Sequence, residues 1–327
     1  LRQLQTSSAK AAAVLFRPQT AWRVRWNLNT DTPLPPDTPA GENPPEGAMI
    51  DYYIGPETTG PVSLEIKDES GQIVRRYSSG DPMPTPNPTL AIPPYWLRPP
   101  QRLAADSGMH RFLWDLHYAP IPGEAPQYPI AAVYKNTAPA PTSPWAMPGK
   151  YTVVLTVGGK SYEQPLTLVM DPRVKTSNAD LLEQFKLSKQ LYDEWLKLDS
   201  ISTSIRRMRD QATQLQTKAP AGDLKAHITA LAEKLQSFSA PGVPGGGSGA
   251  QRITLGGASG RVRTLFNLIQ NVDVAPTSQV VAAIPEVLRD SRAVQENWQA
   301  ISQEIAALNA ELRTAGLPEI ELTKQVR

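Results

Sequence analysis

The sequence predicts an α+β protein in two parts, an antiparallel β-sandwich followed by an antiparallel helical bundle. Proline divides the chain, because 27 of its 33 prolines lie at or before Pro172 and only 6 follow it. Proline removes a backbone donor and clashes inside helices, so the first part cannot be helical over any length. Apolar residues alternate with polar ones in the first part and recur at steps of three and four in the second. These patterns predict an extended connector over 1–47, a sandwich over 48–172, helices over 176–316 and a tail over 317–327.

The composition is that of a protein with room for two folded domains. At 327 residues, 40% hydrophobic and 20% charged, the chain can bury two cores and is too apolar for wholesale disorder. The chain has 33 Lys and Arg residues against 31 Asp and Glu. The resulting net charge of +2 is too small to attract nucleic acid by electrostatics. The absence of cysteine excludes disulfides, thiol catalysis and cysteine-ligated zinc. The chain has no run of 18 apolar residues, so the sequence predicts no transmembrane segment.

Half-buried strands are predicted wherever apolar residues alternate with polar ones. The connector contains two short candidates, 9–16, which fits either a helix or a strand, and 22–26, which alternates like a strand. Further strands are expected near 49–54, 62–66, 73–77, 112–116, 151–157 and 162–170. Several short strands with turns and no helices between them favour a β-sandwich. Two long proline-rich loops, 79–102 and 119–148, lie between the strands, and loops of this length often contact something.

Four helices are predicted in the second part, two long and two short. A heptad seam from Leu181 to Leu215 predicts a helix over about 178–217. Two shorter helices are expected over 224–238 and 259–273, and a second long one over 280–312. We expect the four to run up, down, up and down, with two helices at the base and four at the distal end. The glycine-rich segment 241–249 is predicted to be a flexible loop, and 256–260 a mobile hairpin linker, with weak anion binding at the N-terminus of the following helix as the alternative.

The sequence offers no catalytic, cofactor-binding or metal-binding constellation. His110, Asp115 and His117 lie near one another, with Glu124 as a fourth candidate metal ligand. Alternation along one strand would place His110 on one face and Asp115 and His117 on the other, so we expect ordinary polar residues there. His227 is expected on a solvated helix face. The glycine-rich segments lack the spacing of a phosphate loop, and no serine has a histidine placed to activate it.

Aromatic residues gather in or near the two long loops. They could form a surface that binds carbohydrate or peptide, and the alternative is that they pin the proline-rich loops onto the sandwich, which requires large apolar anchors. The candidate binding residues are Tyr95, Trp96, Tyr118, Tyr128, Tyr134 and Trp145.

Two pieces of the first part resemble the immunoglobulin-like domain of flagellar hook-assembly proteins. One is Val62 to Tyr77, with Asp68 and Gly71 in its turn. The other is the run GMHRFLWD at 108–115, followed by PGKYTV at 148–153. This resemblance implies that the sandwich is Ig-like.

The whole chain, from Leu1 to about Pro318, resembles the C-terminal region of bacterial sortilin-like proteins with BNR-repeat β-propellers, which are often labelled glycosyl hydrolases. The segments that carry the resemblance are NTDTPLPP at 29–36, GENPPEGAMIDYY at 41–53 and Trp114-Asp115. These motifs are structural and none is catalytic. In such proteins a large propeller precedes this region, and the resemblance also implies export, so we expect a periplasmic or secreted protein.

Three functional hypotheses follow from the residues and the resemblance together. The first is a non-catalytic binding or scaffolding region that contacts an N-terminal β-propeller of the same parent protein, or another protein. The second is a pair of supporting domains for a glycoside hydrolase, sialidase-like or peptidase-associated enzyme whose site lies in the propeller. The third is a device for homo-oligomerisation through the helices. We expect no nucleic-acid partner and no cofactor.

Overall fold

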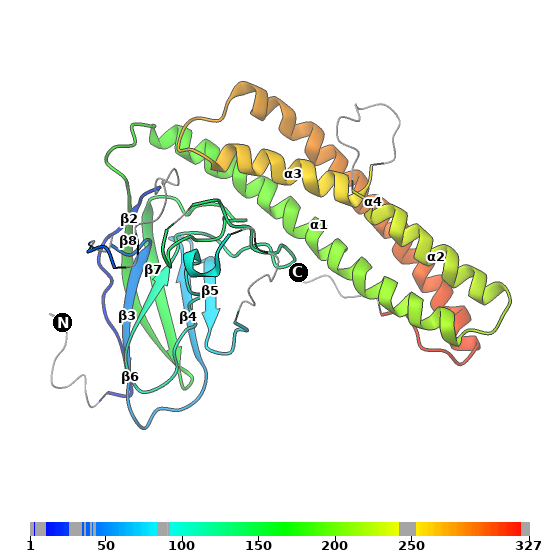
Figure 1. Ribbon diagram of the computed structural model, residues 1–327, viewed down its shortest axis with the longest axis horizontal. Helices are drawn as coiled ribbons and strands as arrows, with labels where there is room; N and C mark the ends of the chain where they lie inside the picture. The colour runs from blue at the N-terminus through cyan, green and yellow to red at the C-terminus, as the bar shows by residue number, and fades with distance from the viewer. Residues whose placement is uncertain are drawn as a thin grey trace. The chain divides into compact units, whose positions relative to one another are not determined.

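Two β-sheets and four α-helices make up the described part of the chain, which places the protein in the α+β class that the sequence predicted (Figure 1). The computed structural model describes residues 3, 11–25, 35, 37–39, 41, 44–83, 90, 92–131, 133–241 and 253–321. Two compact units divide the chain, Leu1–Pro120 with Ala125–Thr176, and Ile121–Glu124 with Ser177–Arg327. They are called here the sheet unit and the helical unit.

The sheet unit contains one sheet of three strands and one of five. The three-stranded sheet has the order β1-β3-β6, with both pairs antiparallel. The five-stranded sheet has the order β2-β8-β7-β4-β5, and all its pairs are antiparallel except the parallel pair of β2 and β8. The strands are β1 Ala13–Leu15, β2 Ala21–Arg23, β3 Ala48–Ile54, β4 Val62–Lys67, β5 Ile73–Ser78, β6 Gly108–Trp114, β7 Gly149–Val157 and β8 Lys160–Met170.

One hydrophobic core joins the two sheets. Buried and half-buried residues alternate along β3 and β4, because successive side chains of a strand point to opposite faces. Ile50 of the smaller sheet and Leu64 of the larger one are both fully buried in the same cluster. Trp114 at the end of β6 lies there too, its indole edge to face with the ring of Tyr151, with centroids 5.4 Å apart.

Part of the expected connector belongs to the sheets. The strand candidates at 9–16 and 22–26 correspond to β1 and β2. β1 pairs with β3, and β2 pairs with β8. Ala13, Leu15 and Ala21 enter the core, so the sheet unit begins well before the boundary at 48 that the sequence predicted. The proline run at 32–36 concealed this continuity, because proline marks irregular structure without telling which segments rejoin a sheet. Most of 26–43 lies outside the described residues.

The helices of the helical unit begin and end close to the predicted positions. They are α1 Asn178–Lys218, α2 Asp223–Ser239, α3 Leu255–Gln270 and α4 Ser278–Thr314. The hydroxyl of Ser177 accepts a hydrogen bond from the backbone N–H of Asp180, and that of Thr277 accepts one from Val280, so α1 and α4 both start at N-caps. Among the described residues, none of the helices combines the length and the apolar character that a bilayer crossing requires.

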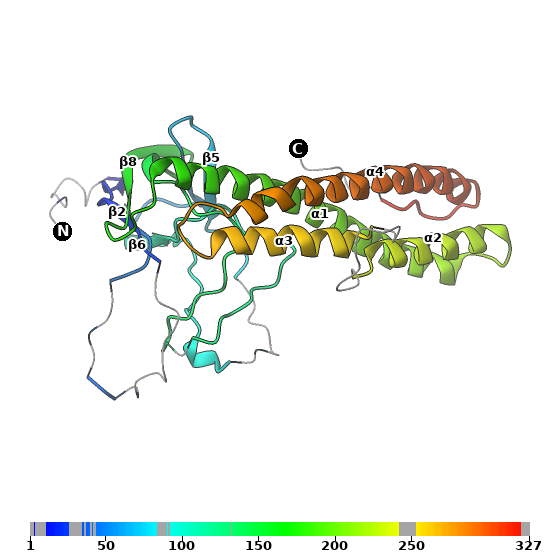
Figure 2. The same ribbon diagram turned by 90° about the horizontal axis from the view of Figure 1, so that it is seen from above.

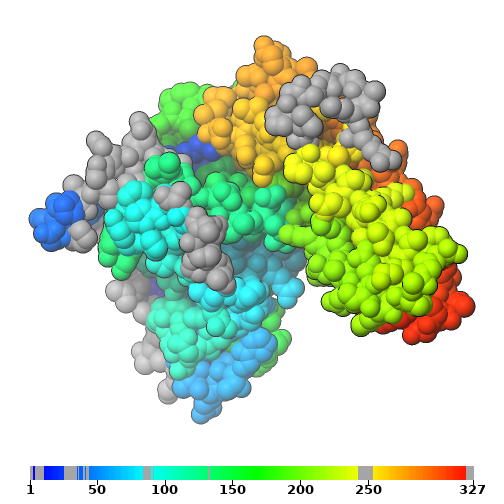
Figure 3. Space-filling model, turned by 45° about the vertical axis from the view of Figure 1, so that its right-hand side comes forward, coloured from blue at the N-terminus to red at the C-terminus, as the bar shows by residue number. Residues whose placement is uncertain are grey.

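The order of helix directions differs from the expected up, down, up and down. Gln184, near the start of α1, donates to the carbonyl of Ile269 at the end of α3 over 2.8 Å. Gln216, near the end of α1, donates to the hydroxyl of Thr229 in the first half of α2 over 3.4 Å. Both α2 and α3 therefore run antiparallel to α1 and follow one another along it (Figure 1). In Figure 3 the atoms of α2 (yellow-green) lie next to those of α3 (yellow to orange) on the surface.

The last helix returns parallel to α1. Ser291, in the first half of α4, donates to Glu194 in the first half of α1, and Glu311 near the end of α4 pairs with His227 of α2. The helical unit is therefore built from α1, α4 and the collinear pair α2–α3, instead of two helices at one end and four at the other. Helix lengths alone could not distinguish these two arrangements, since both fit two long and two short helices.

The glycines at 256–260 lie in the first turns of α3, which corrects their prediction as a linker. An ideal Cβ built on Gly256 would lie 2.6 Å from the carbonyl oxygen of Ala240, just after α2. Glycine therefore serves close approach of the two helix ends here. The segment 242–249, most of the predicted flexible loop, lies outside the described residues.

Candidate functional site

The two proline-rich loops of the sheet unit pair with each other through their backbones. The N–H of Lys135 donates to the carbonyl of Tyr95, that of Thr137 to Trp96 and that of Arg98 to Thr137, each over 2.9 Å. Leu97 and Thr137 also form an isolated parallel bridge. Figure 2 shows the short 3-10 helix η2, Pro94–Trp96, on loops that extend away from the strands. Backbone pairing of this kind gives long loops a defined conformation.

This pairing brings together three of the six predicted aromatic residues. The ring centroid of Tyr95 lies 6.5 Å from that of Tyr134 and 6.2 Å from that of Trp96, with the second pair edge to face. The ammonium of Lys135 lies 5.2 Å from the centroid of the Tyr134 ring, within the range of a cation–π interaction. We call Tyr95, Trp96, Tyr134 and Lys135 the aromatic loop surface.

Two of these rings face solvent instead of the core. The side chain of Tyr95 is 56% exposed and that of Tyr134 is 44% exposed, whereas Trp96 is half-buried. The indole N–H of Trp96 is buried and has no hydrogen-bond partner among the described residues. Anchors that pin a loop to a core are buried, so Tyr95 and Tyr134 do not act as such anchors.

The backbone of Lys135 adopts a left-handed conformation, with φ of 50°. Residues other than glycine rarely adopt this conformation and do so at a cost of about 1 kcal/mol or more. The turn is held by the N–H of Asn136 bonding to Val133, and the guanidinium of Arg98 bonds to the Asn136 side chain over 2.9 Å and to Glu46 over 2.6 Å. These contacts fix the position of Lys135 beside Tyr134.

The other three predicted aromatic residues lie elsewhere in the sheet unit. Trp145 is buried, and its ring packs against the imidazole of His117 and under the guanidinium groups of Arg23 and Arg25, 5.4 and 5.2 Å from the ring centroid. Tyr118 is half-buried, and its carbonyl accepts hydrogen bonds from Arg75 and Ser143. Tyr128 is also half-buried. The alternative interpretation, that the aromatics anchor loops, therefore fits Trp145.

The histidine considered for a metal site is buried in the same cluster. His117 follows Leu116, which has a left-handed backbone with φ of 62°, and this turn breaks the alternation that would have exposed the imidazole. Its Nδ1 lies 2.7 Å from the carbonyl of Asp115, an acceptor, so Nδ1 carries the proton. Nε2 is buried and lacks a hydrogen-bond partner among the described residues. Burial lowers the pKa of His117 to about 4, although Asp115 acts in the opposite direction.

The remaining members of that metal candidate lie apart. Nε2 of His110 contacts the carbonyl of Asp106 over 2.7 Å, and Glu124 accepts a hydrogen bond from the indole of Trp195 in the helical unit. Across the residues the structure describes, no group of three or more His, Cys, Asp or Glu side chains lies close enough to hold a metal ion. His227, expected to be solvated, is exposed but pairs with Glu311 over 2.8 Å.

A small hollow of about 140 Å³ lies in the helical unit beside the start of α3. The backbone N–H of Gly123 donates to Asp199 over 3.1 Å there, and Trp195 donates to Glu124 over 3.3 Å. Burial raises the pKa of Asp199, while the Gly123 hydrogen bond lowers it. Pockets for small organic ligands usually enclose several hundred Å³. The hollow is too small for such a ligand, and both carboxylates are already engaged.

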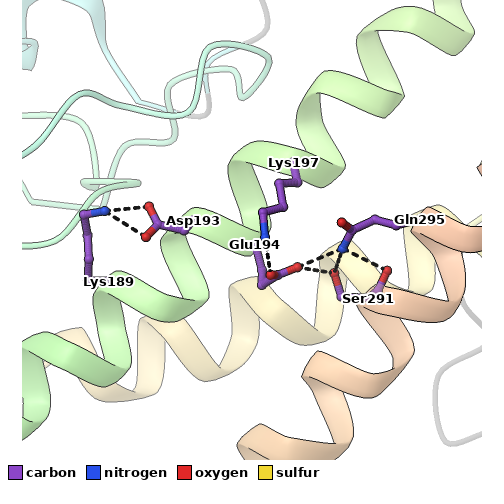
Figure 4. A network of polar contacts seen from close by, with 6 residues as sticks. All are labelled: Lys189, Asp193, Glu194, Lys197, Ser291 and Gln295. Atoms are coloured by element: carbon purple, nitrogen blue, oxygen red, sulfur yellow. Dashed lines mark hydrogen bonds and ion pairs between the residues drawn. The ribbon is translucent and has the colours of Figure 1, made fainter. Parts of the chain in front are cut away.

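Polar side chains lie within the helix contacts of the helical unit. Glu194 of α1 accepts hydrogen bonds from Ser291 and Gln295 of α4, over 2.8 and 2.9 Å, and from Lys197 over 2.7 Å (Figure 4). Burial raises the pKa of Glu194, but the hydrogen bonds outweigh it and leave the pKa below its ordinary value. Lys189 and Asp193 in the same view form a separate ion pair within α1. The Glu194 network sets the register of α4 on α1 and has no group arranged for catalysis.

Sequence reasoning missed the contribution of Lys135 to the aromatic loop surface. The missed signal is that the stretches 92–105 and 125–141 contain Arg98, Arg102 and Lys135 but no Asp or Glu. A comparison with known proteins adds nothing to this site, since no family model matches the chain and no curated protein matches it either.

Proposed function

We propose that this chain is a non-catalytic binding and scaffolding region of an exported β-propeller protein, and that the aromatic loop surface contacts its protein partner. The partner is the β-propeller of the same parent protein or a separate protein. In this proposal the sheet unit is an Ig-like sandwich and the helical unit a bundle that serves as scaffold. Export and the propeller are inferred from the sequence resemblance alone.

The exposure of Tyr95 and Tyr134 on loops that are paired through their backbones is the observation that supports this function. Aromatic side chains dominate the energy of protein interfaces, because each buries a large area while losing only two side-chain torsions. Loops fixed by hydrogen bonds lose little further entropy on binding. Exposed tyrosines on a defined backbone are thus suited to a contact surface.

The proposed Ig-like sandwich is supported by the shared core and the strand alternation of the two sheets. Residues of both sheets form one buried cluster that includes Trp114. Sandwich folds place their binding loops at the ends of the sheets, where sequence can vary without disturbing the core. The aromatic loop surface lies on the loops between β5 and β6 and between β6 and β7.

Binding between this chain and a BNR-repeat β-propeller, produced as a separate polypeptide, tests the proposal. We expect the native chain to bind, and the double variant Tyr95→Ala/Tyr134→Ala to bind at least about 30-fold more weakly, because truncating even one hot-spot residue costs about 2 kcal/mol. Ile73→Ala is the matched control, since Ile73 is 51% exposed in the same unit but lies on β5.

Two results would contradict the proposal. Equal affinities of the double variant and the Ile73→Ala control would remove the tyrosines from the contact surface. Hydrolysis of a glycoside or peptide by the isolated chain would overturn the non-catalytic role.

A further inference from the structure

We propose that the segment bound by the aromatic loop surface is an extended acidic peptide, which places a carboxylate at Lys135 and an apolar side chain against Tyr95 and Tyr134. This inference rests on the proposed function and specifies the chemistry of the partner.

The parts of the two loops that pair with each other, 92–105 and 125–141, are cationic, although Asp81, Asp106 and Glu124 lie in the flanking parts. The stretches 92–105 and 125–141 carry three cationic residues and no carboxylate. Two of the cations are already engaged, since Arg98 pairs with Glu46 and Arg102 donates twice to the carbonyl of Ser79. Among the described residues no carboxylate pairs with Lys135, which is exposed. Lys135 is therefore the cation of this surface that is available to a partner.

The strained backbone of Lys135 supports the same assignment. Its left-handed conformation holds the side chain across the ring of Tyr134, so a cation and an apolar surface are presented side by side. A ligand that satisfies both needs an acidic group next to an apolar one. Charge complementarity of this kind sets partner choice and the rate of encounter more than it sets affinity.

An extended peptide fits this surface better than a nucleic acid or a sugar. Nucleic acid requires several free cations along a groove, and the chain has a net charge of only +2. Each sugar hydroxyl donates one hydrogen bond, for which carboxylate and amide oxygens are suitable acceptors. Among the described residues, the Glu46 carboxylate beside this surface is occupied by Arg98, and the Asn136 amide oxygen by the same guanidinium. A peptide needs only the rings and the cation that the surface offers.

Selection from a displayed library of random 12-residue peptides tests the inference. The native chain is the target, and peptides that also bind Tyr95→Ala/Tyr134→Ala are removed by counterselection. We expect the retained peptides to be enriched in Asp and Glu next to apolar or proline residues. Synthetic copies should bind Lys135→Glu about tenfold more weakly than the native chain, and Lys160→Glu with unchanged affinity. Lys160 is an exposed lysine of the same unit, at the start of β8, and so controls for net charge.

The outcomes separate this inference from the proposed function. Peptides that depend on the two tyrosines but are neutral or basic, or that bind both lysine variants equally, would overturn the acidic partner and leave the contact surface in place. Failure to retain any peptide after counterselection would overturn the peptide partner, while the contact surface would be decided by the binding of the double variant to the β-propeller. If the chain binds glycans on an array through the two tyrosines and binds no peptide, the ligand of the surface is a carbohydrate and the peptide proposal is wrong.

Discussion

The imidazole of His117 packs against the indole of Trp145, with ring centroids 4.0 Å apart and the planes tilted by 47°. The two residues also form an isolated antiparallel bridge, flanked by hydrogen bonds from Tyr118 to Pro144 and from Ala146 to Leu116. This contact joins the segment after β6 to the segment before β7. Protonation of this imidazole should destabilise the sheet unit, because burial removes the water that would hydrate the charged ring.

The sheet unit should lose stability as the pH falls through the titration range of His117. An imidazole whose pKa is lowered from 6.5 to about 4 in the folded state stabilises the fold above pH 6.5, and this contribution disappears as the pH falls from 6.5 to 4. The loss is roughly 3 kcal/mol, and Arg23 and Arg25 add to the cost of charging the ring. Urea unfolding of the sheet unit between pH 7.5 and 4 measures it.

The variant His117→Gln provides the comparison, since glutamine does not titrate. We expect its stability to vary less with pH than that of the native chain over the same range. His110→Gln is the control, because it removes the imidazole of β6 that contacts Asp106. Identical pH profiles for the native chain and His117→Gln would contradict the assignment of the acid sensitivity to His117.

Removal of the Ser291 hydroxyl should weaken the link between α1 and α4. Ser291 is fully buried and donates to Glu194. We expect Ser291→Ala to cost about 1 kcal/mol and to raise the pKa of Glu194. A carboxyl whose pKa is lowered in the folded state stabilises the fold when the pH is above its ordinary pKa of 4.5, and this contribution is lost as the pH falls. The native chain should therefore lose more stability than the variant below pH 4.5. Carbon-13 titration of the Glu194 carboxyl measures the shift.

The matched control for this change is Ser302→Ala. Ser302 also lies in α4, but its hydroxyl bonds only to the carbonyl of Trp298 in its own helix. Its removal should leave the Glu194 titration unchanged. A similar shift of the Glu194 pKa in both variants would show that the hydroxyl of Ser291 does not act on the carboxyl directly.

The helices and strands of this fold could be predicted because the spacing of apolar residues within each segment is enough to indicate its type. Alternation along Val62–Lys67 predicts a half-buried strand whatever its neighbours are, and the heptad seam from Leu181 to Leu215 predicts α1. The predicted heptad seam of α1 is also buried for the most part. The buried stripe is wider than the seam and includes Gln184, Leu191 and Ile201, because α1 is covered by more than one neighbouring helix.

The arrangement of these elements could not be predicted, because it depends on contacts between distant residues. Tyr95 and Tyr134 lie on separate loops, and only the backbone pairing around Thr137 shows that they meet. A single left-handed residue, Leu116, reverses the face on which His117 lies. No alternation rule includes such a turn at a leucine, since this conformation is rare for bulky residues.

Two glycines of α3 should respond to alanine in opposite ways. A Cβ on Gly256 would meet the backbone of Ala240 at 2.6 Å, and backbone atoms cannot move aside cheaply. We expect Gly256→Ala to destabilise the helical unit by about 1–3 kcal/mol. A Cβ on Gly260 meets no atom within 4 Å, so Gly260→Ala should stabilise the unit by about 0.5–1 kcal/mol through helix propensity. Thermal unfolding of the two variants compares them, and stabilisation by both would refute the close approach of α2 and α3.

Asn309 forms two hydrogen bonds to the segment after α4. Asn309 donates from Nδ2 to the carbonyl of Ile320 over 2.9 Å and accepts from its N–H over 2.8 Å, and both residues are buried. Asn309→Ala leaves both backbone groups unpaired, so we expect a loss of about 2 kcal/mol and faster hydrogen exchange at the Ile320 amide. Glu319→Ala is the control, because it breaks only an exposed ion pair with Arg313 and should leave stability nearly unchanged. Equal exchange rates at Ile320 in the two variants would show that the Asn309 side chain does not hold this segment.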